Sequence, residues 1–276
     1  MIITLYSQHK RQTIFMRITL TILAFIFIQQ SYAQGFESLC NDGLRSLRKK
    51  EYKNAINNFE RAAMMSNTEE EKIYALANLA FSYQVTGDIR NALENYNKAL
   101  MINREEITLM QQRAGLYMYL DSIDKALADF TFILQKEPGN RSALFYRAHI
   151  YTQSGEYSKA RADYHLLMQI DPNDNNTRLG YARLYQKEKR YNECLMLLGQ
   201  LIEDNPSRAE FYISRSDVSR EMGHTELALL DVDKAIELEP ENANFHNLKS
   251  ILLDKLGKKE AARRSQSKAN MLKNKQ

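Results

Sequence analysis

The chain has 276 residues and a formal net charge of +4, from 38 basic and 34 acidic residues. Three of the basic residues and none of the acidic ones lie in the first 33 positions, so the remainder has a net charge of only +1. General nucleic-acid binding needs a strongly basic stripe or face. The nearly neutral remainder argues against that class of function.

The first 33 residues have the layout of a secretory signal peptide. Three basic residues precede an apolar run over residues 18–28, and the Ser-Tyr-Ala sequence that follows is a small-x-small cleavage site. We expect cleavage after Ala33 and a mature protein in the periplasm or outside the cell. The apolar run is shorter than the roughly 20 residues that span a bilayer. An uncleaved membrane anchor is the alternative, and Met16 is an alternative start.

A repeat of 34 residues organises the chain after the signal. Its only prolines recur at this interval, at Pro138, Pro172, Pro206 and Pro240. Tyrosines and small residues keep the same spacing, namely Tyr83, Tyr117, Tyr151 and Tyr185, and Ala92, Ala126, Ala160, Cys194, Ala228 and Ala262. Proline lacks a backbone N–H and restricts the residue before it, so each copy ends one helical element per repeat. A period of this length predicts a solenoid of stacked units.

We expect this solenoid to span residues 36–276. The repeats lie near residues 36–69, 73–106, 107–140, 141–174, 175–208, 209–242 and 243–276. About three extra residues fall between Ser66 and Lys72, where the spacing is longer.

Each repeat is predicted to be a pair of amphipathic helices. Apolar residues recur three and four positions apart, as in Leu144, Ala148 and Tyr151. The turn between the two helices carries glycine in four repeats, at Gly87, Gly155, Gly223 and Gly257, as a turn with positive φ requires. N-caps of the following helices are expected at Asn140, Asp174 and Asn242. The predicted fold class is therefore all-α.

These residues resemble the tetratricopeptide repeat (TPR) family over nearly the whole chain after the signal. One repeat matches the family pattern with Ala114, Tyr117, Ala126, Phe130 and Pro138. A position of the first helix is small in every repeat, reading Gly43, Ala80, Ala114, Ala148, Ala182, Ser216 and Ser250. The resemblance implies a right-handed superhelical solenoid of about seven helix-turn-helix repeats, and a function in binding proteins or peptides.

The last helix, from Lys258 to about Leu272, is expected to cap the solenoid. Residues 243–276 carry nine basic and two acidic residues. A solubilising cap explains this charge, and contact with an acidic partner or a lipid surface is the alternative.

The two cysteines lie four repeats apart, too far for a disulfide within one chain. Cys194 replaces an alanine of the repeat and is expected to be buried. An exposed Cys40 near the open end, able to bridge two chains, is a second hypothesis.

No catalytic or metal-binding motif is found. The histidines His149, His165, His224 and His246 are scattered, and no HExxH, phosphate-binding loop or nucleophile elbow is present in the sequence. We expect no enzyme activity, metal, cofactor or small-molecule substrate.

In the family that this chain resembles, five positions of each first helix line a concave groove that holds a peptide or a partner's helix. Carried onto this chain, these positions give the groove candidates Tyr74, Phe81, Met118, Tyr119, Phe145, His149, Arg183 and Arg220. They also include Thr152 and Leu179. The alternative for Phe81 and Phe145 is that they pack against neighbouring helices.

The sequence thus predicts a non-enzymatic scaffold of the periplasm or cell exterior that binds a protein or peptide and no nucleic acid. The alternative is a membrane-tethered envelope assembly factor that retains its N-terminal segment as an anchor. Membrane contact is expected only in that second case.

Overall fold

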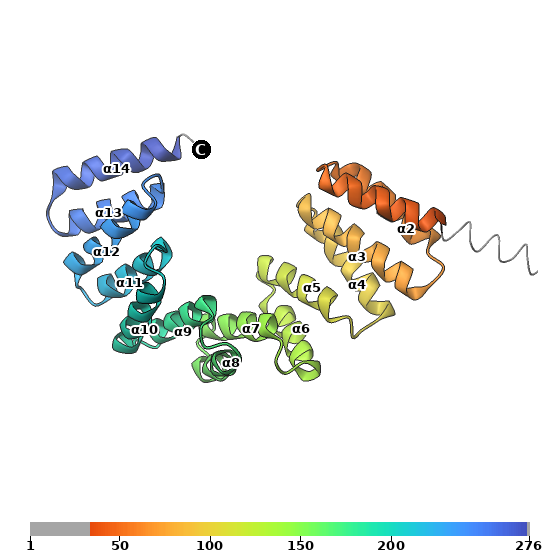
Figure 1. The fold of residues 1–276 in the computed structure, drawn as a ribbon, viewed down its shortest axis with the longest axis horizontal. Coiled ribbons are helices and arrows are strands. Elements are labelled where there is room, and N and C mark those ends of the chain that lie inside the picture. The colour runs from red at the N-terminus through yellow and green to blue at the C-terminus, as the bar shows by residue number, and fades with distance from the viewer. Residues whose placement is uncertain (1–33, 275–276) are drawn as a thin grey trace, which may run out of the picture. The chain divides into compact units, whose positions relative to one another are not determined.

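A computed structural model describes residues 34–274 of the chain (Figure 1). The predicted signal peptide lies outside these residues. Residues 34–48 are helical, and thirteen further helices follow. They are α2 (Tyr52–Met65), α3 (Glu69–Val85), α4 (Ile89–Ile102), α5 (Ile107–Tyr119), α6 (Ile123–Lys136), α7 (Arg141–Gln153), α8 (Tyr157–Ile170), α9 (Asn175–Lys187), α10 (Tyr191–Asp204), α11 (Ala209–Glu221), α12 (Thr225–Leu238), α13 (Ala243–Lys255) and α14 (Lys259–Lys273). No residue between positions 34 and 274 is assigned to a strand.

The helices repeat with the period of the sequence, which confirms an all-α helical repeat fold. From α5 onward the first helix of each pair begins 34 residues after the previous one, at Ile107, Arg141, Asn175, Ala209 and Ala243. The extra residues between Ser66 and Lys72 lengthen a helix instead of a loop. Helix α3 has 17 residues where α5 has 13, and Thr68 caps its N-terminus by accepting a hydrogen bond from the Glu71 amide.

Contacts divide the chain into two compact units, Met1–Asp129 and Phe130–Gln276. We call the described parts of these unit 1 and unit 2, and each is treated separately. Within both units, consecutive helices pack against one another, as in α3 with α4 and α11 with α12.

The small residues of the repeat lie where paired helices cross. Ala92, Ala126, Ala160 and Ala228 are completely buried, and Cys194 is 1% exposed. Side chains larger than these would collide with the facing helix, since the interior is close-packed. At Gly43 the approach is closest, because a Cβ there would lie 2.7 Å from the ring of Phe59.

The turn within each helix pair has the same left-handed residue whether or not it is glycine. Gly155 has φ +77°, as predicted. Lys50, Asp121 and Lys189 occupy the equivalent position in three other repeats with φ between 54° and 61°. The repeated packing therefore holds these residues in a conformation that L side chains disfavour. The predicted caps are confirmed, since Asn140, Asp174 and Asn242 each accept a hydrogen bond from a first-turn amide.

A bidentate ion pair ties the two helices together in three repeats. The pairs are Arg113–Asp129, Arg147–Asp163 and Arg215–Asp231, each with two N–H···O bonds of 2.6–2.9 Å. In the repeat formed by α9 and α10 both partners are replaced, by Tyr181 and Leu197. Tyr181 instead stacks on Tyr164 and Tyr185, with centroids 5.7 and 4.7 Å away.

Both cysteines are buried free thiols, so the hypothesis of an exposed Cys40 is wrong. Cys40 is 5% exposed, because it shares a helix face with Gly43, which packs directly on Phe59. Burial, with a smaller effect of the Glu71 charge, raises the pKa of the Cys40 thiol to about 11. Burial likewise raises the pKa of Cys194 to about 12. The raised pKa disfavours the reactive thiolate form of both cysteines.

Among the described helices, none combines the length and apolar character that a bilayer crossing requires.

Candidate functional site

The groove candidates of unit 1 are apolar, and most of them are exposed. Tyr74 and Phe81 lie two turns apart on one face of α3, and each is 44% exposed. Tyr119, the last residue of α5, is 76% exposed, while Met118 beside it is half-buried. Because Phe81 remains open, packing between helices does not account for it in this unit.

The candidates of unit 2 are more tightly held. Phe145 on α7 is half-buried and makes edge contacts with the rings of Tyr146 and Tyr164, at 5.7 and 6.4 Å. Packing thus explains part of its environment. Arg183 on α9 is exposed and donates to Glu210 at 3.2 Å, and Arg220 on α11 donates to Asp217 at 3.2 Å.

Two positions carried over from the family pattern do not reach the surface. Thr152 and Leu179 are 3% and 4% exposed, so their assignment to the groove was wrong. The Thr152 hydroxyl donates to the Ala148 carbonyl at 2.8 Å, and Leu179 belongs to the core between α9, α10 and α11. Adjacent repeats pack closely enough here to cover both side chains.

A first hollow of unit 2 lies at the N-terminal part of α7, and we call it the aromatic hollow. It has a volume of about 430 Å³, and its apolar lining is Phe145, Tyr146 and Leu167. The polar residues around it are Arg141, Ser142, Asp174, Asn176 and Thr177. Arg141 is paired with Asp171 at 3.0 Å and lies 3.9 Å from Asp174, so this hollow has no unpaired cation.

A second hollow lies at the C-terminal ends of α7, α9 and α11, and we call it the basic hollow. Its volume is about 390 Å³, and it is lined by Gln153, Arg183, Gln186, Lys187, Lys189, Tyr191 and Glu221. Three cations therefore face one carboxylate. Glu221 accepts a hydrogen bond of 2.9 Å from Gln186, whereas Lys187 and Lys189 have no carboxylate within 4.0 Å in the described part of the chain.

One stripe of α7 connects the two hollows. Phe145, His149 and Gln153 follow one another at intervals of four residues, so they lie on the same helix face. Phe145 lines the aromatic hollow and Gln153 the basic one, with half-buried His149 between them. Burial lowers the pKa of His149, and the neighbouring charge of Arg183 lowers it further. The imidazole is thus neutral near pH 7 and adds no charge to the stripe.

Known proteins of similar sequence and structure decide the family. Two profiles described as tetratricopeptide repeat match residues 112–175 and 153–215. The crystal structure of a tetratricopeptide repeat protein from Parabacteroides merdae aligns with a TM-score of 0.78 and 26% identity, over 87% of this chain and 93% of that one. This chain is a tetratricopeptide repeat protein. Residues 41–125 of the TPR chain also match a domain of unknown function, DUF6340.

More distant structures share the fold alone. PilW, described as a type IV pilus biogenesis factor, has a TM-score of 0.62 at 18% identity, over 70% of the TPR chain and 90% of its own. MamA from Desulfovibrio magneticus has a TM-score of 0.52 at 18% identity, over 62% and 96%. FK506-binding protein 59 of Drosophila melanogaster is 27% identical over 81 residues, which are 28% of the TPR chain and 18% of that protein.

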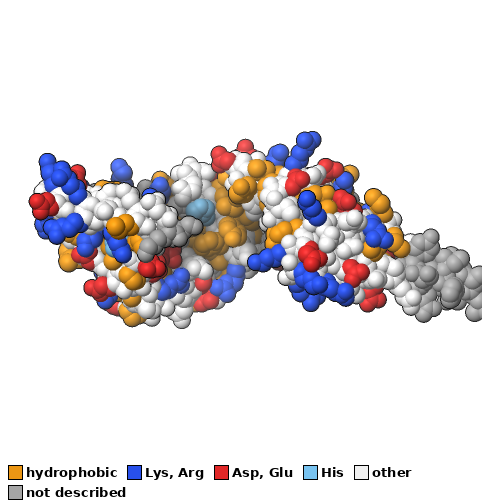
Figure 2. All heavy atoms as spheres, turned by 90° about the horizontal axis from the view of Figure 1, so that it is seen from above, with side chains coloured by type: hydrophobic (Ala, Val, Ile, Leu, Met, Phe, Trp, Pro, Cys, Tyr) orange, Lys and Arg blue, Asp and Glu red, His pale blue; other side chains and the backbone are white. Residues whose placement is uncertain are grey.

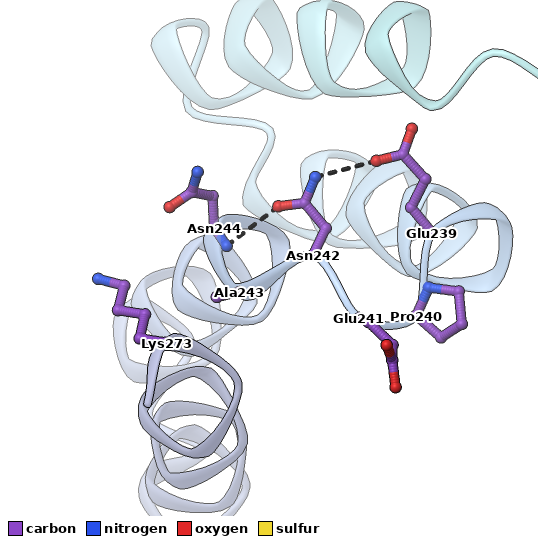
Figure 3. Close-up of a pocket in the computed structure, with 7 residues that line it drawn as sticks. All are labelled: Glu239, Pro240, Glu241, Asn242, Ala243, Asn244 and Lys273. Atoms are coloured by element: carbon purple, nitrogen blue, oxygen red, sulfur yellow. Dashed lines mark hydrogen bonds between the residues drawn. The ribbon is translucent and has the colours of Figure 1, made fainter. Parts of the chain in front are cut away.

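Other surface features of the TPR chain are less suited to binding. A hollow of about 590 Å³ lies beside the loop from Glu239 to Asn244 (Figure 3). Asn242 there accepts from the Asn244 amide and donates to Glu239, so its side chain serves the loop and helix cap, and Figure 3 shows Glu241 directed away from Lys273. On the face drawn in Figure 2, basic and acidic side chains are interspersed. Within residues 34–274, no group of three His, Cys, Asp or Glu residues could hold a metal ion.

The ion pairs within the repeats have a signal in the sequence. The arginines and aspartates of the ion pairs recur at the repeat period and lie 16 residues apart in each pair. The basic hollow had no comparable signal, because it combines residues of three repeats.

Proposed function

We propose that this TPR protein is a non-catalytic scaffold that binds a segment of a partner protein across α7, α9 and α11. The stripe from Phe145 through His149 to Gln153, with a hollow at each end, is the observation that carries the proposal. Partly exposed aromatic side chains beside polar groups are typical anchors of protein interfaces.

The experiment is affinity capture from the native cell envelope, followed by quantitative mass spectrometry. The stripe variant carries Phe145→Ala and His149→Ala, and the control variant carries Arg263→Gln, Arg264→Gln and Lys268→Gln in the basic cap. Far-UV circular dichroism and melting must first show that both variants fold, since Phe145 also packs on its neighbours.

We expect the stripe variant to lose its partners and the cap variant to keep them. Loss of an interface anchor typically weakens binding by about 2 kcal/mol or more. If the cap variant lost its partners and the stripe variant kept them, the interaction would lie on α14 and the proposal would be rejected. A third variant, Phe81→Ala with Tyr119→Ala, tests separately whether the exposed aromatic residues of unit 1 contribute.

The proposed location is the periplasm or the cell exterior. It is supported by the pattern of residues 1–33 and is tested by the intact mass of the protein from the envelope fraction. A mature N-terminus at Gln34, or its cyclised form, is the expected result. A species that retains residues 18–33 and sediments with membranes would instead support the membrane-tethered assembly factor.

A further inference from the structure

We infer that the segment bound by unit 2 carries an apolar side chain, preferably aromatic, and an acidic side chain about four residues away from it. The apolar side chain occupies the aromatic hollow and the acidic one the basic hollow. This inference rests on the proposed function and specifies the chemistry of its partner.

The aromatic hollow selects an apolar group because its two charged residues already have partners. Arg141 is held by Asp171, and Asp174 accepts hydrogen bonds from both the amide and the hydroxyl of Thr177, at 3.0 and 2.6 Å. The apolar surface that remains open is that of Phe145 and of Tyr146, which is 45% exposed. Covering that surface is favourable, whereas a charged side chain placed there would lose water without gaining an ion pair.

The basic hollow selects an anionic group for the opposite reason. Arg183 is engaged by Glu210 and Gln186 by Glu221, which leaves Lys187 and Lys189 as cations without an ion pair among the described residues. Lys189 is fixed at the turn by its left-handed backbone, with φ 60°. The phenol of Tyr191 and the amide of Gln153 line the same hollow and supply neutral donors for a carboxylate.

The distance between the hollows sets the spacing of the two side chains. Phe145 and Gln153 are eight residues apart on α7, which corresponds to about 12 Å at 1.5 Å per residue. An extended segment rises about 3.3 Å per residue, so about four residues cover this distance. In an extended chain, side chains four residues apart also point to the same side. The geometry sets no chain direction, so both orders of the two side chains satisfy it.

The test is selection from a library of random linear segments displayed on phage, with residues 34–276 of the chain as the target. We expect enrichment, relative to the unselected library, of segments with an aromatic and an acidic residue about four positions apart, in either order. Binding of the best-enriched segment, made as a labelled peptide with blocked termini, is then measured by fluorescence anisotropy.

A double-mutant cycle locates the contact. Lys187→Gln with Lys189→Asn removes both charges, and asparagine tolerates the left-handed backbone at the second site. This double substitution in the protein should weaken binding roughly fivefold, and so should replacing the acidic residue of the peptide by its amide. The two changes together should weaken binding little more than either alone. Lys268→Gln with Lys273→Gln, an equal charge change on α14, is the matched control and should leave affinity unchanged.

The outcomes separate the inference from the proposed function. Enriched segments that lack this pattern, or fully multiplicative effects in the cycle, would overturn the inference. If their binding is nevertheless lost in the Phe145→Ala and His149→Ala variant, the proposed binding surface stands. If the library yields no binding segment, both the inference and the proposed peptide-binding function fail.

Discussion

The ion pair between α7 and α8 allows a quantitative test of how the repeats are held together. Arg147 and Asp163 make two hydrogen bonds of 2.8 and 2.7 Å, and their side chains are 19% and 7% exposed. Removing one partner of a fully buried pair typically costs 3–5 kcal/mol, because the other charge is left unpaired. Some solvent reaches this pair, so Arg147→Met should lower the free energy of unfolding by about 2 kcal/mol.

The chain itself suggests the compensating change. Tyr181 and Leu197 occupy the equivalent positions of the next repeat, so an apolar pair is compatible with this fold. Replacing a whole buried ion pair by apolar residues is often neutral. The double variant Arg147→Met with Asp163→Leu should therefore return to within about 1 kcal/mol of wild type.

The assay is urea unfolding followed by far-UV circular dichroism, with amide hydrogen exchange to locate the change. Repeat arrays need not unfold in one step, so faster exchange should be concentrated in α7 and α8. Arg264→Met is the control, since its pair with Glu260 is 80% and 90% exposed and should contribute less than about 0.5 kcal/mol. If the single and double variants were equally destabilised, the unpaired charge would not be the cause.

Three further predictions concern packing, backbone and pH. Ala160→Leu should overpack the helix crossing and lower the free energy of unfolding by roughly 1–3 kcal/mol, while Lys125→Leu on the surface should change it little. Equal melting temperatures of the two variants would contradict the assigned packing. Gly155→Ala should lower the free energy of unfolding by about 1 kcal/mol because of its positive φ alone, since nothing lies within 4 Å of the added Cβ. Lys189→Gly, at a position with the same positive φ, should raise it. Urea midpoints that move in the opposite directions would refute this. The pKa of His149 in the folded protein lies below its ordinary value of 6.5, so as the pH falls the unfolded chain binds this proton first and stability should decrease. The melting temperature should therefore fall less between pH 7.5 and pH 5 in the His149→Gln variant than in the wild type. An equal fall in both would assign the pH dependence to other groups.

The repeat fold could be predicted from the sequence because the same local features recur in each repeat. The prolines, the small residues at the helix crossing and the caps are determined by contacts within one repeat or with the next. Cys194 was correctly placed in the core for this reason, as it occupies an alanine position.

What could not be predicted depends on how closely repeats pack and on their combined surface. Thr152 and Leu179 were assigned to the groove by position, but adjacent repeats cover them. Lys189 has a left-handed backbone that its residue type does not indicate. The basic hollow requires the ends of α7, α9 and α11 to come together, which no single repeat encodes.

Site-specific photocrosslinking in the native envelope tests the central claim most directly. A benzophenone side chain replaces His149, in the middle of the stripe, or Met196, a 63% exposed residue on the second helix α10. The proposal predicts that a partner protein is crosslinked from position 149 and not from position 196. A partner crosslinked only from position 196 would show that binding uses another face of unit 2.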